Sequence, residues 1–136
     1  MTSSLAAQQR LVSSDSTGTF TIYWSGSDFG FHYNPLDASP PSTATAATGL
    51  SYSINNWYNL TVTNNPIAGT RFYVNGVLKA VGEASVPLAG NITFGSDRTN
   101  SIYAAAQIPV AMIYNRVLTA DEVDRNFNAL RGRYSV

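Results

Sequence analysis

Two apolar segments on either side of Asn75-Gly76 limit the fold of this chain more than any other feature. Residues 71–74 read Arg-Phe-Tyr-Val, and residues 77–80 read Val-Leu-Lys-Ala. Both central residues of a type I′ turn need a positive φ, which asparagine and glycine adopt most easily. The pattern therefore predicts a β-hairpin of two antiparallel strands, with a positive φ at Gly76.

Strand patterns fill most of the remaining chain. Residues 19–24 alternate cleanly, with Phe20, Ile22 and Trp24 on one face, and residues 29–33 return after a turn. Four more strands are predicted, at residues 50–54, 57–63, 91–94 and 108–114. Since 136 residues are enough for one core, these strands predict a mostly β fold, an antiparallel β-sandwich.

The last predicted strand, residues 108–114, is apolar at nearly every position, which is typical of a central strand covered on both faces. At the edge of a sheet, its unpaired N–H and C=O groups would invite pairing with another chain. Natural edge strands are protected by charge or proline, and only Pro109 offers that here. We therefore hypothesise that the chain does not work as a free monomer.

One short C-terminal helix is predicted at about residues 119–131. Thr119 as N-cap and Glu122 as third helical residue form a capping box. Three apolar residues follow at i, i+4 and i+7 and form one stripe: Val123, Phe127 and Leu130. Gly132 stands where a left-handed C-terminal cap belongs.

Residues 1–18 are small and polar, and we interpret them as an N-terminal arm or linker before one domain of residues 19–136. The formal net charge is zero, so nothing predicts attraction to nucleic acid or to an anionic membrane. Cysteine is absent, which excludes disulfide and thiol chemistry. Only 12% of the residues are charged, a composition that suits a protein embedded in an assembly.

Three segments, taken in order, resemble one family. Residues 56–62 (Asn-Trp-Tyr-Asn-Leu-Thr-Val) are similar to its strand opened by Trp-Tyr, and residues 72–78 (Phe-Tyr-Val-Asn-Gly-Val-Leu) to its hairpin. Residues 113–123 (Ile-Tyr-Asn-Arg-Val-Leu-Thr-Ala-Asp-Glu-Val) are similar to its closing signature. The family is the concanavalin A-like lectin/glucanase superfamily, in particular laminin-G-like (LamG) jelly-roll domains, and the resemblance covers about residues 19–130.

The segment 126–134 resembles the C-terminus of LamG-like modules in virion structural proteins of tailed phages. This resemblance implies a non-enzymatic virion protein of the head-decoration or fibre type, located in the virion. Its partners would be other virion proteins or copies of itself. The alternative that the family implies is a carbohydrate-binding, lectin-like module that attaches to cell-surface glycans.

Family members usually carry a further ~30 to 50 residues of strands before the hairpin that begins at Phe20, as judged from an ordinary single-core domain. Residues 108–114 would normally pair with one of those strands. The resemblance thus implies a jelly roll that lacks N-terminal strands, or one in which the arm or a neighbouring subunit takes their place.

We predict no catalytic, cofactor-binding or metal-binding residues. Glucanases of the superfamily place two carboxylates on one strand, and no such strand motif occurs here. The nearest cluster, Asp121, Glu122 and Asp124, falls in the first helical turns, where helix capping and the helix dipole explain it. The only histidine, His32, is interpreted as a half-exposed strand residue.

LamG domains often bind calcium at a rim of the sandwich through carboxylate and carbonyl oxygens. Asp28 and Asp97 lie in predicted loops, but turn formation explains isolated aspartates better. Calcium therefore stays a minor alternative.

Five aromatic residues are candidates for a ligand-binding or interface surface: Trp24, Tyr33, Tyr52, Trp57 and Tyr103. Sugar-binding sites stack pyranose rings on Trp or Tyr beside amide groups, but half-buried aromatic residues are also typical of strands. We favour a role in the core or in an interface over a sugar platform.

Overall fold

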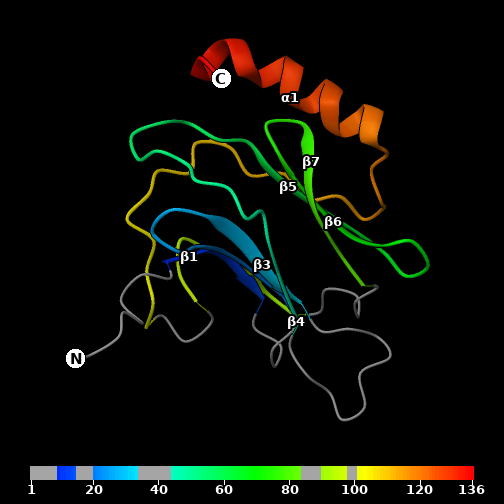
Figure 1. Ribbon diagram of the computed structural model, residues 1–136, viewed down its shortest axis with the longest axis horizontal. Helices are drawn as coiled ribbons and strands as arrows, with labels where there is room; N and C mark the ends of the chain where they lie inside the picture. Colours follow the sequence, from blue (N-terminus) through cyan, green and yellow to red (C-terminus); the bar gives the residue numbers. More distant parts are fainter. Residues whose placement is uncertain (1–8, 15–19, 34–43, 84–89, 98–100) are drawn as a thin grey trace.

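The computed structural model describes residues 9–14, 20–33, 44–83, 90–97 and 101–136. Within these ranges the elements follow in the order β1 (Gln9–Ser14), β2 (Phe20–Trp24), β3 (Phe29–Tyr33), β4 (Ala44–Ala47), β5 (Leu60–Asn65), β6 (Gly69–Val74), β7 (Val77–Gly82), β8 (Ile92–Phe94) and α1 (Ala120–Tyr134). They form three layers, with α1 on the outer side of the smaller sheet (Figure 1). Among the described residues, no helix is long and apolar enough to span a membrane.

The larger sheet has the strand order β4-β3-β2-β1-β8, and the smaller one has the order β5-β6-β7. All neighbouring strands are antiparallel. The predicted fold class, a mostly β antiparallel sandwich with one C-terminal helix, is therefore confirmed.

The main core lies between the two sheets. The larger sheet contributes Ile22, Phe29 and Phe31, and the smaller sheet contributes Phe72 and Val74. The rings of Phe31 and Phe72, both fully buried, meet edge to face with centroids 5.4 Å apart. Such pairs stabilise beyond their buried area, so this contact fixes how the sheets face each other.

The β6–β7 hairpin is confirmed, with a φ of 51° at Asn75 and 75° at Gly76. Strand alternation sends Phe72 and Val74 toward the larger sheet, whereas Tyr73 packs with Leu118 and Val123 on the helix side. The hairpin thus belongs both to the main core and to a second, smaller core under α1, made of Tyr73, Leu118 and Val123.

Gly76→Ala is expected to lower the free energy of unfolding by about 1–3 kcal/mol, because a Cβ is strained at positive φ and would lie 3.0 Å from Cδ1 of Phe127. Denaturant unfolding monitored by circular dichroism measures the loss. Gly95→Ala is the control, since Gly95 has a φ of 79° but nothing within 4 Å of an added Cβ. Equal losses in both variants would show that the contact with Phe127 adds nothing.

The start of α1 follows the prediction, and its end does not. Thr119 and Glu122 form the predicted capping box, whereas Ser135, with a φ of 56°, is the left-handed C-terminal cap. Gly132, predicted to be that cap, lies inside the helix. The last turn continues because the ring of Tyr134 packs against Trp57 with centroids 5.4 Å apart.

Residues 9–14 of the predicted arm form β1 in the interior of the larger sheet, so they are part of the domain, in line with the alternative in which the arm supplies a strand. Val12 is paired with Ile22 of β2 on one side and with Phe94 of β8 on the other. The segment has only one short apolar pair, Leu11-Val12, so its backbone hydrogen bonds to two neighbours define the strand. The rest of the predicted arm lies outside the described residues.

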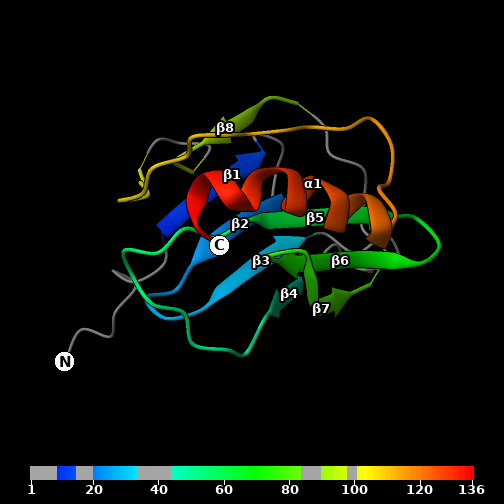
Figure 2. The same cartoon turned by 90° about the horizontal axis from the view of Figure 1, so that it is seen from above.

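Two predicted strands are not observed. Residues 50–54 form an exposed loop, and residues 108–114 follow an irregular path (Figure 2). The prediction that residues 108–114 form a strand covered on both faces is therefore wrong. Their apolar sequence is typical of a strand, but a strand also needs a neighbour to pair with, and within the described chain no neighbouring strand pairs with these residues.

Candidate functional site

Two surfaces are candidates for function. The first, called the apolar edge, consists of residues 108–114. Its large side chains are 37–63% exposed, and they are Ile108, Val110, Met112, Ile113 and Tyr114. No backbone–backbone hydrogen bond joins residues 106–116 to any residue that the structure describes.

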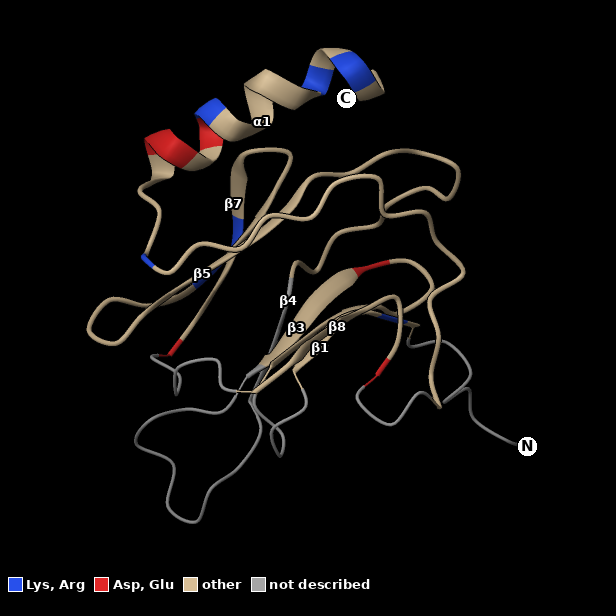
Figure 3. Ribbon diagram, turned by 180° about the vertical axis from the view of Figure 1, so that it is seen from behind, with Lys and Arg blue, Asp and Glu red and all other residues tan. Residues whose placement is uncertain are grey.

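The apolar edge is also free of charge. Residues 101–115 include no Lys, Arg, Asp or Glu. Much of the charge in the described chain lies on α1, with acidic residues at its start and basic residues near its end (Figure 3). The edge therefore combines exposed apolar side chains with backbone groups that form no backbone hydrogen bond to a described residue, and these two features make a segment prone to association.

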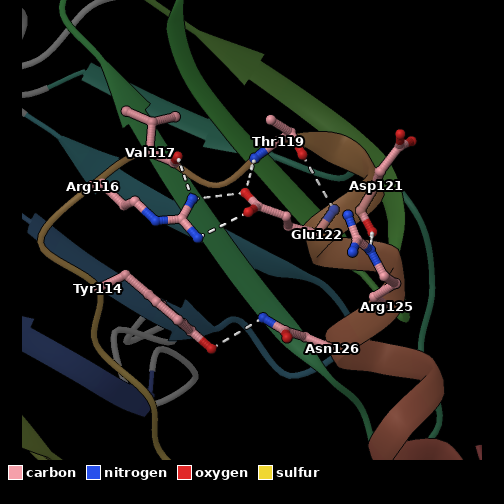
Figure 4. Close-up of polar contacts among 8 residues, drawn as sticks. All are labelled: Tyr114, Arg116, Val117, Thr119, Asp121, Glu122, Arg125 and Asn126. Atoms are coloured by element: carbon pink, nitrogen blue, oxygen red, sulfur yellow. Dashed lines mark hydrogen bonds and ion pairs between the residues drawn. The ribbon is translucent and has the colours of Figure 1, made fainter.

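An ion pair of Arg116, two residues after the apolar edge, fixes the following segment to the start of α1 (Figure 4). Arg116 donates from Nη1 to Oε2 of Glu122 and from Nη2 to Oε1, each at 2.8 Å. Oε2 of Glu122 also accepts from the backbone N–H of Thr119 at 2.9 Å. Beside this pair, Nδ2 of Asn126 donates to the hydroxyl of Tyr114 at 3.1 Å.

The hydrogen bond from Arg116, followed by that from Thr119, lowers the pKa of Glu122 to about 2. A general acid of a glycosidase needs the opposite shift, toward neutral pH. The closing signature of residues 113–123 thus has a structural role at Glu122, which holds the helix start.

The Arg116–Glu122 pair predicts a pH dependence of stability. The pKa of Glu122 is lower in the folded state, so its contribution to stability is complete above the ordinary pKa of 4.5 and is lost as the pH falls toward 2. We expect the difference in melting temperature between the parent and Glu122→Gln to become smaller as the pH is lowered from 4.5 toward 2.

The control for that experiment is Asp121→Asn, on the same helical turn. Asp121 forms no ion pair with any residue in the described part of the chain. A difference between the parent and Glu122→Gln that stays constant from pH 6 to pH 2 would contradict the assignment of the ion pair.

The second surface, called the aromatic pocket, is a cavity of about 450 Å³ at the C-terminal end of α1. Its lining has two aromatic rings in contact and several side-chain amides. The lining residues are Asn55, Asn56, Trp57, Tyr58, Asn75, Tyr134, Ser135 and Val136.

Hydrogen bonds hold the walls of the aromatic pocket. Asn75 accepts through Oδ1 from the backbone N–H of Asn59 at 2.9 Å, and its own N–H donates to the carbonyl of Asn59 at 2.8 Å. The hydroxyl of Tyr58 accepts from the N–H of Ser53 at 3.0 Å and donates to the carbonyl of Ser53 at 3.1 Å. Hydrogen bonds at Ser53 and at Asn59 thus hold the loop before β5 in place.

The five aromatic candidates separate in the structure. Trp24 and Tyr52 each pack against Phe29, with centroids 4.7 and 4.9 Å apart, so both belong to the edge of the main core. Trp57 lines the aromatic pocket. Tyr103 is 63% exposed and does not line the aromatic pocket, and the side chain of Tyr33 lies outside the described residues.

Sequence reasoning missed Tyr134 and the two asparagines before Trp57. Tyr134 follows the predicted end of the helix by three residues, so no pattern linked it to a site. The pair Asn55-Asn56 is not among the predicted site residues, although two amides directly before a tryptophan are a usable signal.

The two loop aspartates each organise a turn. Asp28 accepts from the hydroxyl of Thr48 and, at 2.9 Å, from the N–H of Gly49. Asp97 accepts from the N–H groups of Ser101 and Ile102 at 2.6 and 2.9 Å. The described residues contain no group of three side chains that could hold a metal ion, and these contacts favour the turn-forming role.

His32 lies in a row of rings on the larger sheet. It stacks on Tyr23 with centroids 4.6 Å apart, and the guanidinium of Arg10 lies 5.7 Å from the centre of the Tyr23 ring. Burial and then the charge of Arg10 lower the pKa of His32, and burial raises the pKa of Tyr23. The half-buried His32 is a packing residue in this row.

Comparison with known proteins agrees with the fold. The laminin G model of the concanavalin A-like lectin/glucanases superfamily matches residues 1–124. No curated protein matches the sequence significantly, whereas 38 chains of solved structures do.

One of these structures is the Botulinum Neurotoxin Type G Receptor Binding Domain, with a TM-score of 0.54 and 17% identity. The match covers 92% of this chain but only 32% of the toxin domain. Another is an S-layer domain-containing protein (residues 221–444) from Clostridium thermocellum ATCC 27405, with a TM-score of 0.43 and 20% identity over 93% of this chain and 66% of that one. The toxin likeness shows a shared fold, and the family match covers most of the sequence. The chain therefore belongs to the concanavalin A-like lectin/glucanases superfamily.

Proposed function

We propose that this chain is a non-enzymatic structural module that works by protein–protein contact, as a head-decoration or fibre-type protein of a phage virion. The observation that supports this most is the apolar edge, where exposed apolar side chains coincide with backbone groups that have no backbone partner among the described residues. A second β segment placed there would bury the side chains and satisfy the backbone at once.

Three of the described acidic residues support a role without catalysis. Glu122 is held ionised by Arg116, and Asp28 and Asp97 already accept hydrogen bonds within their turns. Hydrolysis of a glycoside needs two carboxyl groups facing the same bond. These three acidic residues already have structural partners.

The partners of the module are further copies of the chain or other proteins of the particle. The mass of the purified protein, measured by light scattering during gel filtration, tests this function. A stable oligomer, or co-purification with particles, is the expected result. A monomer that remains dispersed at high concentration would contradict it.

A second function, carbohydrate binding, has its own supporting observation in the aromatic pocket. Trp57 and Tyr134 provide aromatic surface, and three asparagine side chains surround them. A lectin-like module would then attach to cell-surface glycans. Retention of the protein on glycan beads as a monomer would favour this function over assembly.

A further inference from the structure

We infer that the aromatic pocket is a binding site for a neutral saccharide, an inference that rests on the second of the two functions proposed above. The pocket lies where the loop before β5, the β6–β7 turn and the end of α1 meet. Its volume of about 450 Å³ falls within the range of small-molecule sites, roughly 300–1,000 Å³.

The aromatic part of the lining suits the apolar face of a sugar ring. Trp57 is 38% exposed, so its indole keeps a surface open to solvent although one side meets Tyr134. An exposed tryptophan in a concave site is a large, rigid contact surface with little conformational entropy to lose.

The polar part of the lining suits hydroxyl groups. Each asparagine amide offers both a donor and an acceptor, which is the pairing that a sugar hydroxyl can satisfy. Asn55 and Asn56 are exposed, and Asn75 is fixed by its bonds to Asn59. Because the Asn75 side chain is already fixed, it loses little conformational entropy when a ligand binds.

The lining side chains carry no formal charge. None of the lining residues has an ionisable Lys, Arg, His, Asp or Glu side chain. Among the lining residues, a phosphate or a sialylated sugar would find no cationic side chain, and a cationic ligand would find no carboxylate side chain. The guanidinium of Arg133 lies outside this lining, 5.9 Å from the centre of the Tyr134 ring. A neutral, hydroxyl-rich ligand fits this lining best.

The contact between Trp57 and Tyr134 also stabilises the last turn of α1, so a test needs a residue that does not pack there. Asn56 is exposed, and no hydrogen bond joins its side chain to another described residue. Asn56→Ala should leave the melting temperature unchanged. Trp57→Ala removes the aromatic surface, and Tyr103→Ala is its control because Tyr103 is an exposed aromatic residue that does not line the pocket.

The probes are neutral oligosaccharide fragments of β-glucan, xylan, mannan and α-glucan, with sialyllactose as the charged comparison. Binding is measured by calorimetry and by the NMR shift of the two indole N–H groups. We expect the parent to bind at least one neutral probe and to shift the Trp57 signal. Trp57→Ala should weaken binding at least about tenfold, and Asn56→Ala by about three- to tenfold, the effect of one hydrogen bond.

Binding by the parent that persists unchanged in both variants would overturn this site while leaving carbohydrate binding intact. A parent that binds none of the neutral probes would overturn both the site and the second function. Tighter binding of sialyllactose than of the neutral probes would contradict the inference that the ligand is neutral. If Trp57→Ala fails to fold, the result for Asn56→Ala still decides whether the pocket is the site.

Discussion

Replacing Phe127 by alanine is expected to lower the free energy of unfolding by about 3–5 kcal/mol, the usual cost of removing a buried aromatic side chain. Phe127 is 9% exposed and lies over the β-turn, close enough that a Cβ on Gly76 would be 3.0 Å from its ring. On the same face of α1, Val123 packs with Tyr73 and Leu118. Without the Phe127 ring, the C-terminal half of α1 would lose its main contact with the smaller sheet.

Denaturant unfolding of the Phe127→Ala protein, monitored by far-UV circular dichroism, measures this loss. Leu130→Ala is the control. Leu130 is only half-buried on the same side of the helix, so its replacement should lower the free energy of unfolding by less. A loss below about 1 kcal/mol in Phe127→Ala, far under the cost expected of a buried ring, would show that α1 does not dock through this face.

The features that could be predicted from the sequence are those whose signal is local. The type I′ turn needs only Asn75 and Gly76, and the capping box needs only Thr119 and Glu122. In each case a few neighbouring residues satisfy their own hydrogen bonds or backbone angles. Such elements form in the same way wherever the chain places them.

The features that could not be predicted depend on distant partners. β1 has little apolar pattern and exists because β2 and β8 flank it, whereas residues 108–114 have a strong pattern and no neighbouring strand in the described chain. Gly132 could have ended the helix, but Tyr134 meets Trp57, which lies 77 positions earlier in the chain. Pairing and packing at long range decided all three cases.

The candidate sites show the same division. Trp57 was a candidate from its residue type alone, and so were Trp24 and Tyr52, which the structure places in the core. Only the fold brings Tyr134 and Asn75 next to Trp57. Sequence therefore supplied the kind of residue, and the fold selected which of them share a pocket.

The apolar edge also changes which experiment tests self-association. Deletion of the N-terminal segment would remove β1, a strand paired on both sides, and would disturb the fold itself. A substitution on the edge leaves the sheets intact. Ile113 is the most exposed large residue there, at 63%, and so contributes little to the core of a single chain.

If the chain assembles as proposed, Ile113→Lys is therefore expected to convert that oligomer into a monomer while the melting temperature of the single chain stays unchanged. A charge buried in an apolar contact without a partner costs several kcal/mol, and about 3 kcal/mol already weakens association roughly 100-fold. Sedimentation velocity over a range of concentrations measures the shift. Ile67→Lys is the matched control, since Ile67 is 94% exposed in the β5–β6 turn and adds the same charge away from the edge. If both variants associate as the parent does, the chain assembles through a different surface, and if only Ile113→Lys becomes monomeric, residues 108–114 are the interface.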